Sequence, residues 1–449
     1  MAKIEDLENL LNDFDAEVRK GALLELVGML RHGEISLPAA KPEVNIHIHS
    51  FFSYNVFGWS PTRIAWEGKK YGLEVIGIVD FDVLDGLEEF LRAGNILGIK
   101  SVVGMESRVF VSELADVVTN SPNEPGIHYF MLQGCPADAQ RFGADEVLQR
   151  LRETARSRNK GIISRINEYL GSVKIDYEAD VVPLTPSGNA TERHLLVAYD
   201  RKAREIYGDR AHEFWAGVLE VGAEKMAGLM EDTPSFYDVV RSKLMKFGGV
   251  GYTAPDPASF PSLEEFVALG RRLGAVPTTT WLDGTNEGER DMEANLELFT
   301  HKGAAALNII PDRNWNIKDP DEKTVKTAKL REAVAAARGF DLPISIGTEM
   351  NKIGQPFADD FSAPELTDYV EDFIRGAWFF YGHTVLARLK GWGFGSSWAD
   401  AFFGEDRHAA NRFYEEVGRA AQPSRLILDM IAALPDGAEP ADVIRILSG

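Results

Sequence analysis

The sequence lacks features that several classes of protein require. Among its 449 residues there is a single cysteine, Cys135, so no disulfide can form within the chain. No apolar run reaches the ~18 residues that a membrane-spanning helix needs. The first residues do not place an apolar stretch after a basic one, so no signal peptide is expected. These absences predict a protein of a reducing compartment, with a cytoplasmic location and no membrane partner.

Clustered basic residues are also missing. The formal net charge is −21, the pI is near 4.9, and no run of Lys and Arg interrupts the acidic chain. Binding to duplex nucleic acid is therefore not expected. A small anionic substrate is still compatible with this charge, because a bound metal ion can dominate the local field.

From Val44 onward, short apolar runs alternate with amphipathic stretches. This alternation predicts an α/β fold with a parallel sheet, and seven runs of this kind favour a β/α barrel. No glycine-rich phosphate loop follows the first run, which argues against a doubly wound nucleotide-binding fold. The predicted strands are Val44–His49, Val75–Asp80, Ser101–Glu106, Ile127–Leu132, Val276–Trp281, Ala305–Ile310 and Pro343–Thr348.

Helical patterns flank and interrupt this barrel. Residues 1–40 are predicted to form an N-terminal helical extension, residues 41–360 the barrel, and residues 361–449 a C-terminal helical extension. Between about 140 and 260 the alternation stops, and the interval is too long for a simple loop. We expect a helical insertion there that caps the barrel.

His47 and His49 provide the strongest chemical signal. Residues two apart on a strand point to the same side, so the two imidazoles project together while Ile46 and Ile48 face the other way. Such a pair is half of a metal site for Zn, Mn or Fe. Two ordinary barrel-lining histidines would give the same motif, so the pattern alone leaves both interpretations open.

Residues at the ends of the other predicted strands favour the metal site over two ordinary barrel-lining histidines. In β/α barrels the catalytic groups lie at the C-terminal ends of the strands, and polar residues able to bind metal recur at these positions. A carboxylate there can also bridge two cations. The residues in question are Asp80, Asp82, Glu106, His128, Glu349 and Asn351.

In this order, the motifs resemble the PHP family (polymerase and histidinol phosphatase domains). They are His-x-His, Asp at a second strand end, Gly-x-Glu and a strand His, and the resemblance spans roughly 44–355. It includes Gly188–His194, which is similar to a Gly-x-Pro-His segment in the helical insertion of some family phosphoesterases. The resemblance implies a seven-stranded barrel that holds up to three divalent metals and hydrolyses phosphate esters.

The resemblance also implies a set of metal ligands. A first metal would be bound by His47, His49, Glu106 and Glu349, where the family usually has Asp in place of Glu349. A second metal would use Glu106, His128 and a further ligand. The family's usual His-Pro pair aligns here with Trp281-Leu282, so His194 from the insertion is the expected substitute.

The third metal site of the family is not retained in this sequence. Its three histidine positions correspond to Asn55, Phe81 and Asn351, and a phenylalanine cannot bind a metal. The losses concentrate on one site, which predicts a protein that keeps one or two divalent metals, of Mn, Zn or Fe.

Several residues are candidates for work on a substrate. Asp80 or Asp82 could orient a water molecule, although Asp82 is equally typical of a helix cap. Arg193 and Arg165 could bind phosphate, although a surface role is the more common one for an arginine such as Arg165. Trp281 could stack on a base or sugar. Asn351, and the loop residues Asn308, Asp312 and Arg313 after the sixth strand, could line the same opening.

Taken together, these patterns predict a metal-dependent phosphoesterase with one or two metals. Its substrate would be a small phosphorylated metabolite or nucleotide. The alternative is a non-catalytic barrel that binds a metal or an anion, with the terminal helices as surfaces for partners or for a homo-oligomer. A metal-dependent amide or lactone hydrolase is a third reading, but those barrels place their bridging and final acidic residues differently from Glu106 and Glu349.

Overall fold

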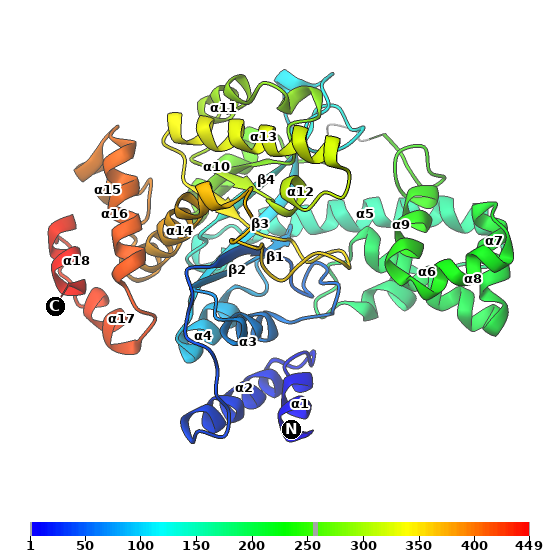
Figure 1. Cartoon of the computed structure of the whole chain (residues 1–449), viewed down its shortest axis with the longest axis horizontal. Helices are drawn as coiled ribbons and strands as arrows, with labels where there is room; N and C mark the ends of the chain where they lie inside the picture. Colours follow the sequence, from blue (N-terminus) through cyan, green and yellow to red (C-terminus); the bar gives the residue numbers. More distant parts are fainter. Residues whose placement is uncertain (1, 255–258, 449) are drawn as a thin grey trace.

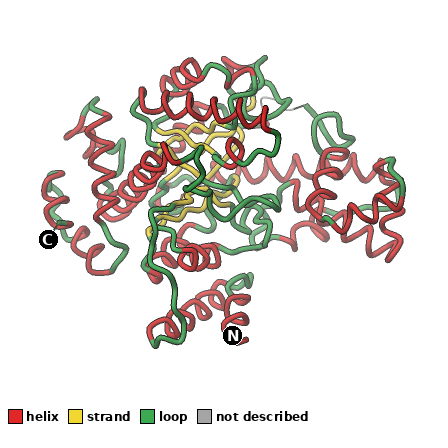
Figure 2. The backbone as a smooth tube through the Cα atoms, viewed as in Figure 1, coloured by secondary structure: helices red, strands yellow, loops and turns green. Residues whose placement is uncertain are grey.

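The seven predicted strands are all present and form one sheet. The structure is a computed structural model that describes residues 2–254 and 259–448, and Figures 1 and 2 show the strands at the centre of the molecule. Their order in the sheet follows their order in the chain. The strands are β1 (Val44–Ile48), β2 (Val75–Phe81), β3 (Lys100–Phe110), β4 (Ile127–Gln133), β5 (Val276–Trp281), β6 (Ala306–Ile309) and β7 (Ile344–Ile346).

The expectation of a wholly parallel sheet is wrong at β4. This strand runs antiparallel to both β3 and β5, whereas the other neighbouring pairs are parallel. The connection from β3 to β4 contains one short 3-10 helix, Ser112–Leu114, and Val111 N donates to Gly126 O at 2.8 Å. A parallel pair needs a crossover, usually helical, so this short connection permits only a hairpin-like return.

The sheet curls until its first and last strands meet, which gives a nearly closed barrel. At the seam, Glu349 N donates to His47 O and His49 N donates to Glu349 O, both at 2.8 Å. Gly347 permits this approach, because a Cβ there would lie 2.6 Å from the backbone nitrogen of His47. The seven-stranded β/α barrel is therefore confirmed.

Helices cover the outside of the barrel and bury its apolar side chains. In α3, Ser60 caps the N-terminus by accepting from Arg63 N, Pro61 occupies the first turn, and Gly72 ends the helix at φ 86°. The covering helices are α3 (Pro61–Tyr71), α4 (Leu87–Leu97), α10 (Leu263–Leu273), α11 (Met292–His301), α12 (Asp312–Trp315) and α13 (Pro320–Gly339).

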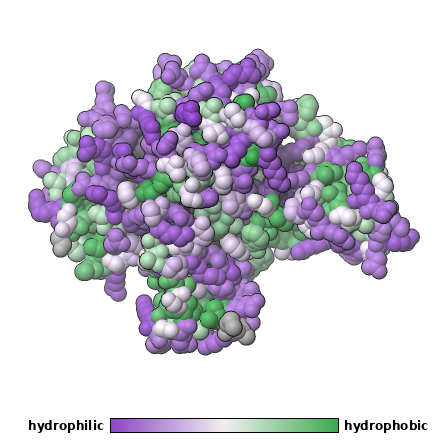
Figure 3. All heavy atoms as spheres, viewed as in Figure 1, coloured by the Kyte–Doolittle hydropathy of each residue, from purple (hydrophilic) through white to green (hydrophobic). Residues whose placement is uncertain are grey.

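Between β4 and β5 the chain forms a helical lobe with an apolar core of its own. Tyr199, Trp215 and Phe236 are fully buried in that core, and the lobe projects from the barrel on the right of Figures 1 and 3. The predicted insertion at about 140–260 includes residues 255–258, which lie outside the described residues. The lobe's helices are α5 (Asp145–Leu170), α6 (Glu192–Tyr207), α7 (Ala211–Leu219), α8 (Ala223–Glu231) and α9 (Thr233–Leu244).

Further helices precede β1 and follow β7 in the chain. The first long helix after β7 is α14, which packs so closely on the sheet that a Cβ on Gly376 would collide with the carbonyl of Ile344. No helix in the described ranges is long and apolar enough to cross a bilayer. The terminal helices are α1 (Ala2–Leu10), α2 (Ala16–Arg31), α14 (Val370–Lys390), α15 (Ser397–Phe403), α16 (Arg407–Ala420), α17 (Arg425–Ala432) and α18 (Pro440–Leu447).

Candidate metal centre

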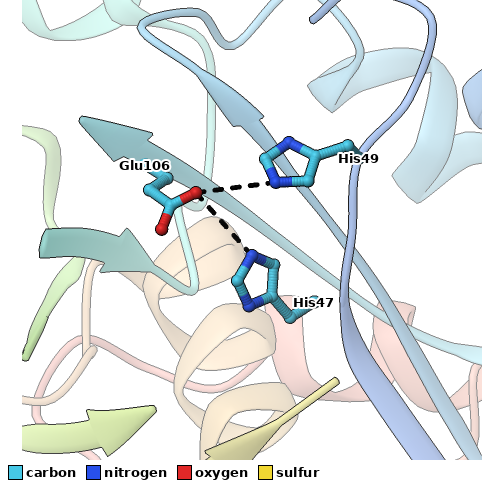
Figure 4. A group of neighbouring side chains, drawn as sticks. All are labelled: His47, His49 and Glu106. Carbon is cyan, nitrogen blue, oxygen red and sulfur yellow. Dashed lines mark ion pairs between the residues drawn. The ribbon is translucent and has the colours of Figure 1, made fainter. Parts of the chain in front are cut away.

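His47, His49 and Glu106 converge inside the barrel. Glu106 Oε2 lies 3.9 Å from His47 Nε2 and 3.5 Å from His49 Nε2, and Figure 4 shows the three side chains pointing toward one another from β1 and β3. All three are buried, and their ligand atoms lie within 4.8 Å of one another. Two imidazole nitrogens and a carboxylate oxygen at this spacing can hold one metal ion.

The strand geometry explains why these three residues meet. His47 and His49 alternate with Ile46 and Ile48, whose side chains join the apolar core. Glu106 pairs in register with Phe81 at the C-terminal end of β2. The cluster therefore lies at the end of the barrel where the parallel strands have their carboxyl ends.

A chain of hydrogen bonds fixes the tautomer of His49. Ser53 Oγ donates its proton to Asp80 Oδ1 at 2.6 Å, and the same oxygen lies 3.1 Å from His49 Nδ1. Because the Ser53 proton is already used, Ser53 accepts from His49 Nδ1–H. The lone pair of His49 is then on Nε2, facing Glu106.

Asn308 orients His47 in the same manner. The Asn308 amide nitrogen lies 3.3 Å from Ser345 O and 3.2 Å from Ser345 Oγ, so its oxygen is turned toward His47 Nδ1 at 3.2 Å. An amide oxygen accepts, so His47 donates from Nδ1 and keeps its lone pair on Nε2. Hydrogen bonds of this kind are typical of histidines that bind a metal.

The electrostatics of the cluster suit a bound cation. Burial lowers the pKa of His47 to about 4 and of His49 to about 3, so both rings are neutral near pH 7. Burial, with Glu349 nearby, raises the pKa of Glu106 well above its usual range. His47 Nε2, His49 Nε2 and Glu106 Oε2 are buried without a hydrogen-bond partner in the described part of the chain. A cation would satisfy all three acceptors, and the residues therefore fit a divalent metal.

Glu349 lies beside this group but is bound to other residues. Its Oε2 accepts from Arg313 Nη2 at 2.8 Å and from Gln355 Nε2 at 2.9 Å. Burial would raise the pKa of Glu349, but the guanidinium of Arg313 and the imidazoles lower it to about 2. The backbone has φ 60° here, in the left-handed region that favours glycine. The structure thus places the predicted ligand in an ion pair.

The structure does not bring His128 to the cluster, so its predicted role as a metal ligand is corrected. Its partner in the register is Val109, whose side chain points to the opposite face of β3 from Glu106. The His128 ring stacks on Phe299 at 4.2 Å, and its Nε2 lies 3.1 Å from Thr279 Oγ1. His128 belongs to the packing between the sheet and α11.

His194 is also engaged away from the cluster. It occupies the first turn of α6, where its Nδ1 accepts from Thr191 N at 3.1 Å and completes a capping box. Its ring lies edge-on to Tyr54 at 5.0 Å. The expectation that His194 replaces the missing second-metal ligand is therefore corrected to a role in capping its own helix.

The three positions of the missing third site have other roles. Phe81 stacks on His49 with ring centroids 4.5 Å apart, which covers one face of that imidazole. Asn55 donates to His49 O at 2.8 Å and accepts from Phe57 N at 2.9 Å, so it shapes the loop after β1. Asn351 accepts from Arg193 Nη2 at 3.2 Å, beside the cavity described below.

The two aspartates after β2 differ in position. Asp80 is buried and accepts from Ser50 N, Ser50 Oγ and Ser53 Oγ, so its place is behind His49 and not in contact with a substrate. This corrects the catalytic assignment of Asp80 to one of positioning. Asp82 lines the cavity at φ 61° and accepts from Ser107 Oγ at 2.5 Å. Burial raises the pKa of Asp82.

Two predicted substrate contacts lie elsewhere, and both are corrected. Trp281 is 1% exposed and packs with Met292 and Leu296 on the outer face of the barrel. Arg165 donates from Nε and Nη2 to Gly251 O at 3.0 and 2.8 Å, inside the lobe. Neither lines the cavity above Glu106.

That cavity lies between the barrel and the lobe and has a volume of about 740 Å³. Glu106 and Glu349 form part of its lining, so the cluster lies at its floor. Its walls include apolar side chains of α5 and α10, such as Leu151 and Leu269. The described lining has five acidic residues and eight basic ones, although the whole chain is strongly acidic. The basic residues are Arg108, Arg150, Arg158, Arg193, Arg241, Lys246, Arg272 and Arg313.

Sequence reasoning missed six of these eight basic residues, and two of the six, Arg108 and Arg158, show which signals were available. Arg108 follows Glu106 by two positions on β3, so strand alternation places both side chains on the inner face. Arg158 shares one face of α5 with the cavity residues Leu151 and Ala155. Both signals are present in the sequence, but the second becomes readable only when the inner face of α5 is known.

No protein-family model matches the sequence, and the comparison with curated proteins finds no match. Among solved structures, the fold is similar to an amidohydrolase from Chromobacterium violaceum with bound sulfate and no metal, at 15% identity and a TM-score of 0.49, over 73% of this chain and 96% of that one. It is also similar to a protein from Bifidobacterium adolescentis, described provisionally as a metal-dependent phosphoesterase, at 16% identity and a TM-score of 0.47, over 75% of this chain and 98% of that one.

Proposed function

We propose that this chain is a metal-dependent phosphoesterase whose divalent metal is bound by His47, His49 and Glu106. The observation that carries the proposal is the convergence of three buried acceptor atoms, unpartnered among the described residues, at the floor of a cavity rich in arginine. The PHP-like order of motifs in the sequence agrees with it. Zn, Mn and Fe all accept this mixture of imidazole and carboxylate ligands.

The cavity supports an anionic substrate. Arg158 and Arg193 have no ion-pair partner in residues 2–254 and 259–448, and burial, with other arginines nearby, lowers the pKa of each to about 10. Arg108 and Arg158 both lie over the Phe260 ring, at 4.7 and 4.8 Å. Crowding guanidinium groups costs free energy, which a bound phosphate would offset.

The volume of the cavity suits a phosphate group together with an organic body. Metal bound at the cluster would act as a Lewis acid and supply an activated water. Asp82 lines the cavity and can take or give a proton there, since burial raises its pKa. Arg193, held by Asn351, can orient the phosphate.

The test combines metal content with turnover. Wild-type protein purified without chelators should contain metal and hydrolyse members of a panel of phosphomonoesters and phosphodiesters. Glu106→Gln and His49→Ala should lose both the metal and the activity, whereas His32→Ala, a change at an exposed histidine of the N-terminal extension, should lose neither. If metal-loaded wild type hydrolyses no ester of the panel, the proposal is wrong.

A non-catalytic metal- or anion-binding barrel is the second candidate. The observation in its favour is the ion pair between Glu349 and Arg313, which engages a residue that the family resemblance implies as a metal ligand. This candidate predicts stoichiometric binding of phosphate without turnover of any ester.

A further inference from the structure

Arg313 places a fixed positive charge next to the candidate metal centre. It lies in α12, directly after β6, and lines the cavity together with Glu106 and Glu349. Its Nη2 donates to Glu349 Oε2 at 2.8 Å.

The guanidinium of Arg313 is not fully used by its acidic partner. Its Nε is buried and has no hydrogen-bond partner in the described part of the chain. The side chain is 41% exposed, and it lines the cavity. An arginine has five N–H donors in a planar fork, and the hydrogen bond to Glu349 uses one of them, on Nη2, so the exposed part of the fork still has donors for the oxygens of an anion in the cavity.

A second arginine–glutamate pair in the same chain shows the contrast. Arg375 of α14 bonds to Glu415 through both Nε and Nη2, at 3.0 and 3.3 Å. Its side chain is 42% exposed, almost the same as that of Arg313. Arg375 therefore uses two donors, Nε and Nη2, for its carboxylate. Arg313 uses Nη2 alone, and its Nε has no partner among the described residues.

The charges of the centre also favour one metal. Histidines bind a metal as neutral rings, and Glu349 is paired with Arg313, so Glu106 is the one carboxylate of the cluster that has no cationic partner among the described residues. One divalent ion satisfies that charge. A second would have no free carboxylate among these residues and would lie beside a guanidinium.

We propose that Arg313 takes the place of a second metal ion: the site binds one metal, and Arg313 supplies the second positive charge that binds the phosphoryl oxygens. The inference rests on the proposed function for the identity of the anion as a phosphoryl group. It makes Arg313 a substrate-binding residue, with Glu349 as the group that positions it.

Inorganic phosphate is the probe, measured by calorimetry with manganese-loaded full-length protein, alongside metal content per chain. Wild type should contain about one metal. Arg313→Met should keep at least that metal content and bind phosphate at least tenfold more weakly. Arg313→Lys keeps the charge without the fork and should fall between the two. Arg375→Met, the matched control, should bind phosphate as wild type does.

Two results would overturn the inference. One is unchanged phosphate affinity in Arg313→Met, and the other is two metals per wild-type chain. If Arg313→Met does not fold, Arg313→Lys decides the matter, because phosphate affinity equal to wild type would again contradict the role. If phosphate binding needs Arg313 but no ester is hydrolysed, the phosphoesterase proposal is wrong and this inference stands. If esters are hydrolysed and Arg313→Met binds phosphate as wild type does, the phosphoesterase proposal stands and this inference is wrong.

Discussion

Buried histidines lie at two strands of this barrel, β1 and β4, in different surroundings. On β1, burial lowers the pKa of His47 to about 4 and of His49 to about 3, and on β4 it lowers the pKa of His128 to about 3. The three histidines therefore have nearly equal pKa values. They differ at Nε2, which lies 3.1 Å from Thr279 Oγ1 in His128 but has no hydrogen-bond partner among the described residues in His47 and His49. The comparison teaches that burial alone does not single out a candidate metal ligand, whereas unpartnered acceptors that converge on one another do.

The largest expected effect separates the two strands directly. His49→Ala should lower metal content from about one per chain to nearly zero, with at least a 100-fold loss of affinity, because a ligand is removed. His128→Gln should leave metal content unchanged. Mass spectrometry of the purified proteins measures both, and loss of metal from His128→Gln would show that β4 contributes to the site after all.

A smaller effect is expected from the residues that orient the imidazoles. Asn308→Leu removes the acceptor of His47 Nδ1, and Ser53→Ala removes that of His49 Nδ1. Each should weaken metal binding roughly 10- to 100-fold, because the ring and its tautomer are no longer fixed. Competition with a fluorescent chelator gives the affinities. Thr119→Val, at the Nδ1 partner of His128, is the matched control and should change nothing.

The pH dependence of stability should identify His128 as a buried neutral group. Its pKa is about 6.5 when unfolded and about 3 when folded, so the unfolded state binds more protons below pH 6.5 and stability falls as the pH decreases toward 3. At pH 5 this amounts to about 2 kcal/mol relative to pH 7. Urea unfolding at both pH values gives the free energy of unfolding of metal-free wild type and of His128→Gln. The loss of free energy from pH 7 to pH 5 should be larger in wild type by that amount. Parallel pH profiles would contradict the burial of a titrating ring.

The smallest effect is expected at Arg165, a predicted phosphate ligand that the structure places inside the lobe. Arg165→Gln removes hydrogen bonds to the Gly251 carbonyl and should lower the free energy of unfolding by about 1 kcal/mol. Phosphate affinity should equal that of wild type in calorimetry. A weaker affinity would mean that the lobe brings Arg165 to the cavity in solution.

The barrel and the β1 motif could be predicted because they depend on short-range patterns. Strand–helix alternation locates all seven strands, and the spacing of two residues places His47 and His49 on one face. The direction of β4 was not predicted, although the absence of a helical pattern between β3 and β4 was available as a signal.

The direction in which His128 points depends on the register between β3 and β4, which cannot be read from the sequence. Its side chain lies opposite Val109, one residue out of phase with Arg108 and Glu106, so a shift of one position would have turned it inward. His194 is determined locally, by its capping box at the start of α6, whereas Arg313 depends on the contact of α12 with Glu349, which lies 36 residues further along the chain.

The seam of the barrel links folding to chemistry. The same two backbone hydrogen bonds of Glu349 join the last strand to the first, and they flank the residues that carry the imidazoles. Closing the barrel brings together two segments that lie about 300 residues apart in sequence, and it places Glu349 beside the two imidazoles. With the seam open, His47, His49 and Glu106 would still lie close together at β1 and β3, which are joined through β2, but Glu349 would be missing beside them. On the proposed function, the affinity for metal would therefore differ between the open and the closed barrel, and metal titration would then report on folding as well as on the site.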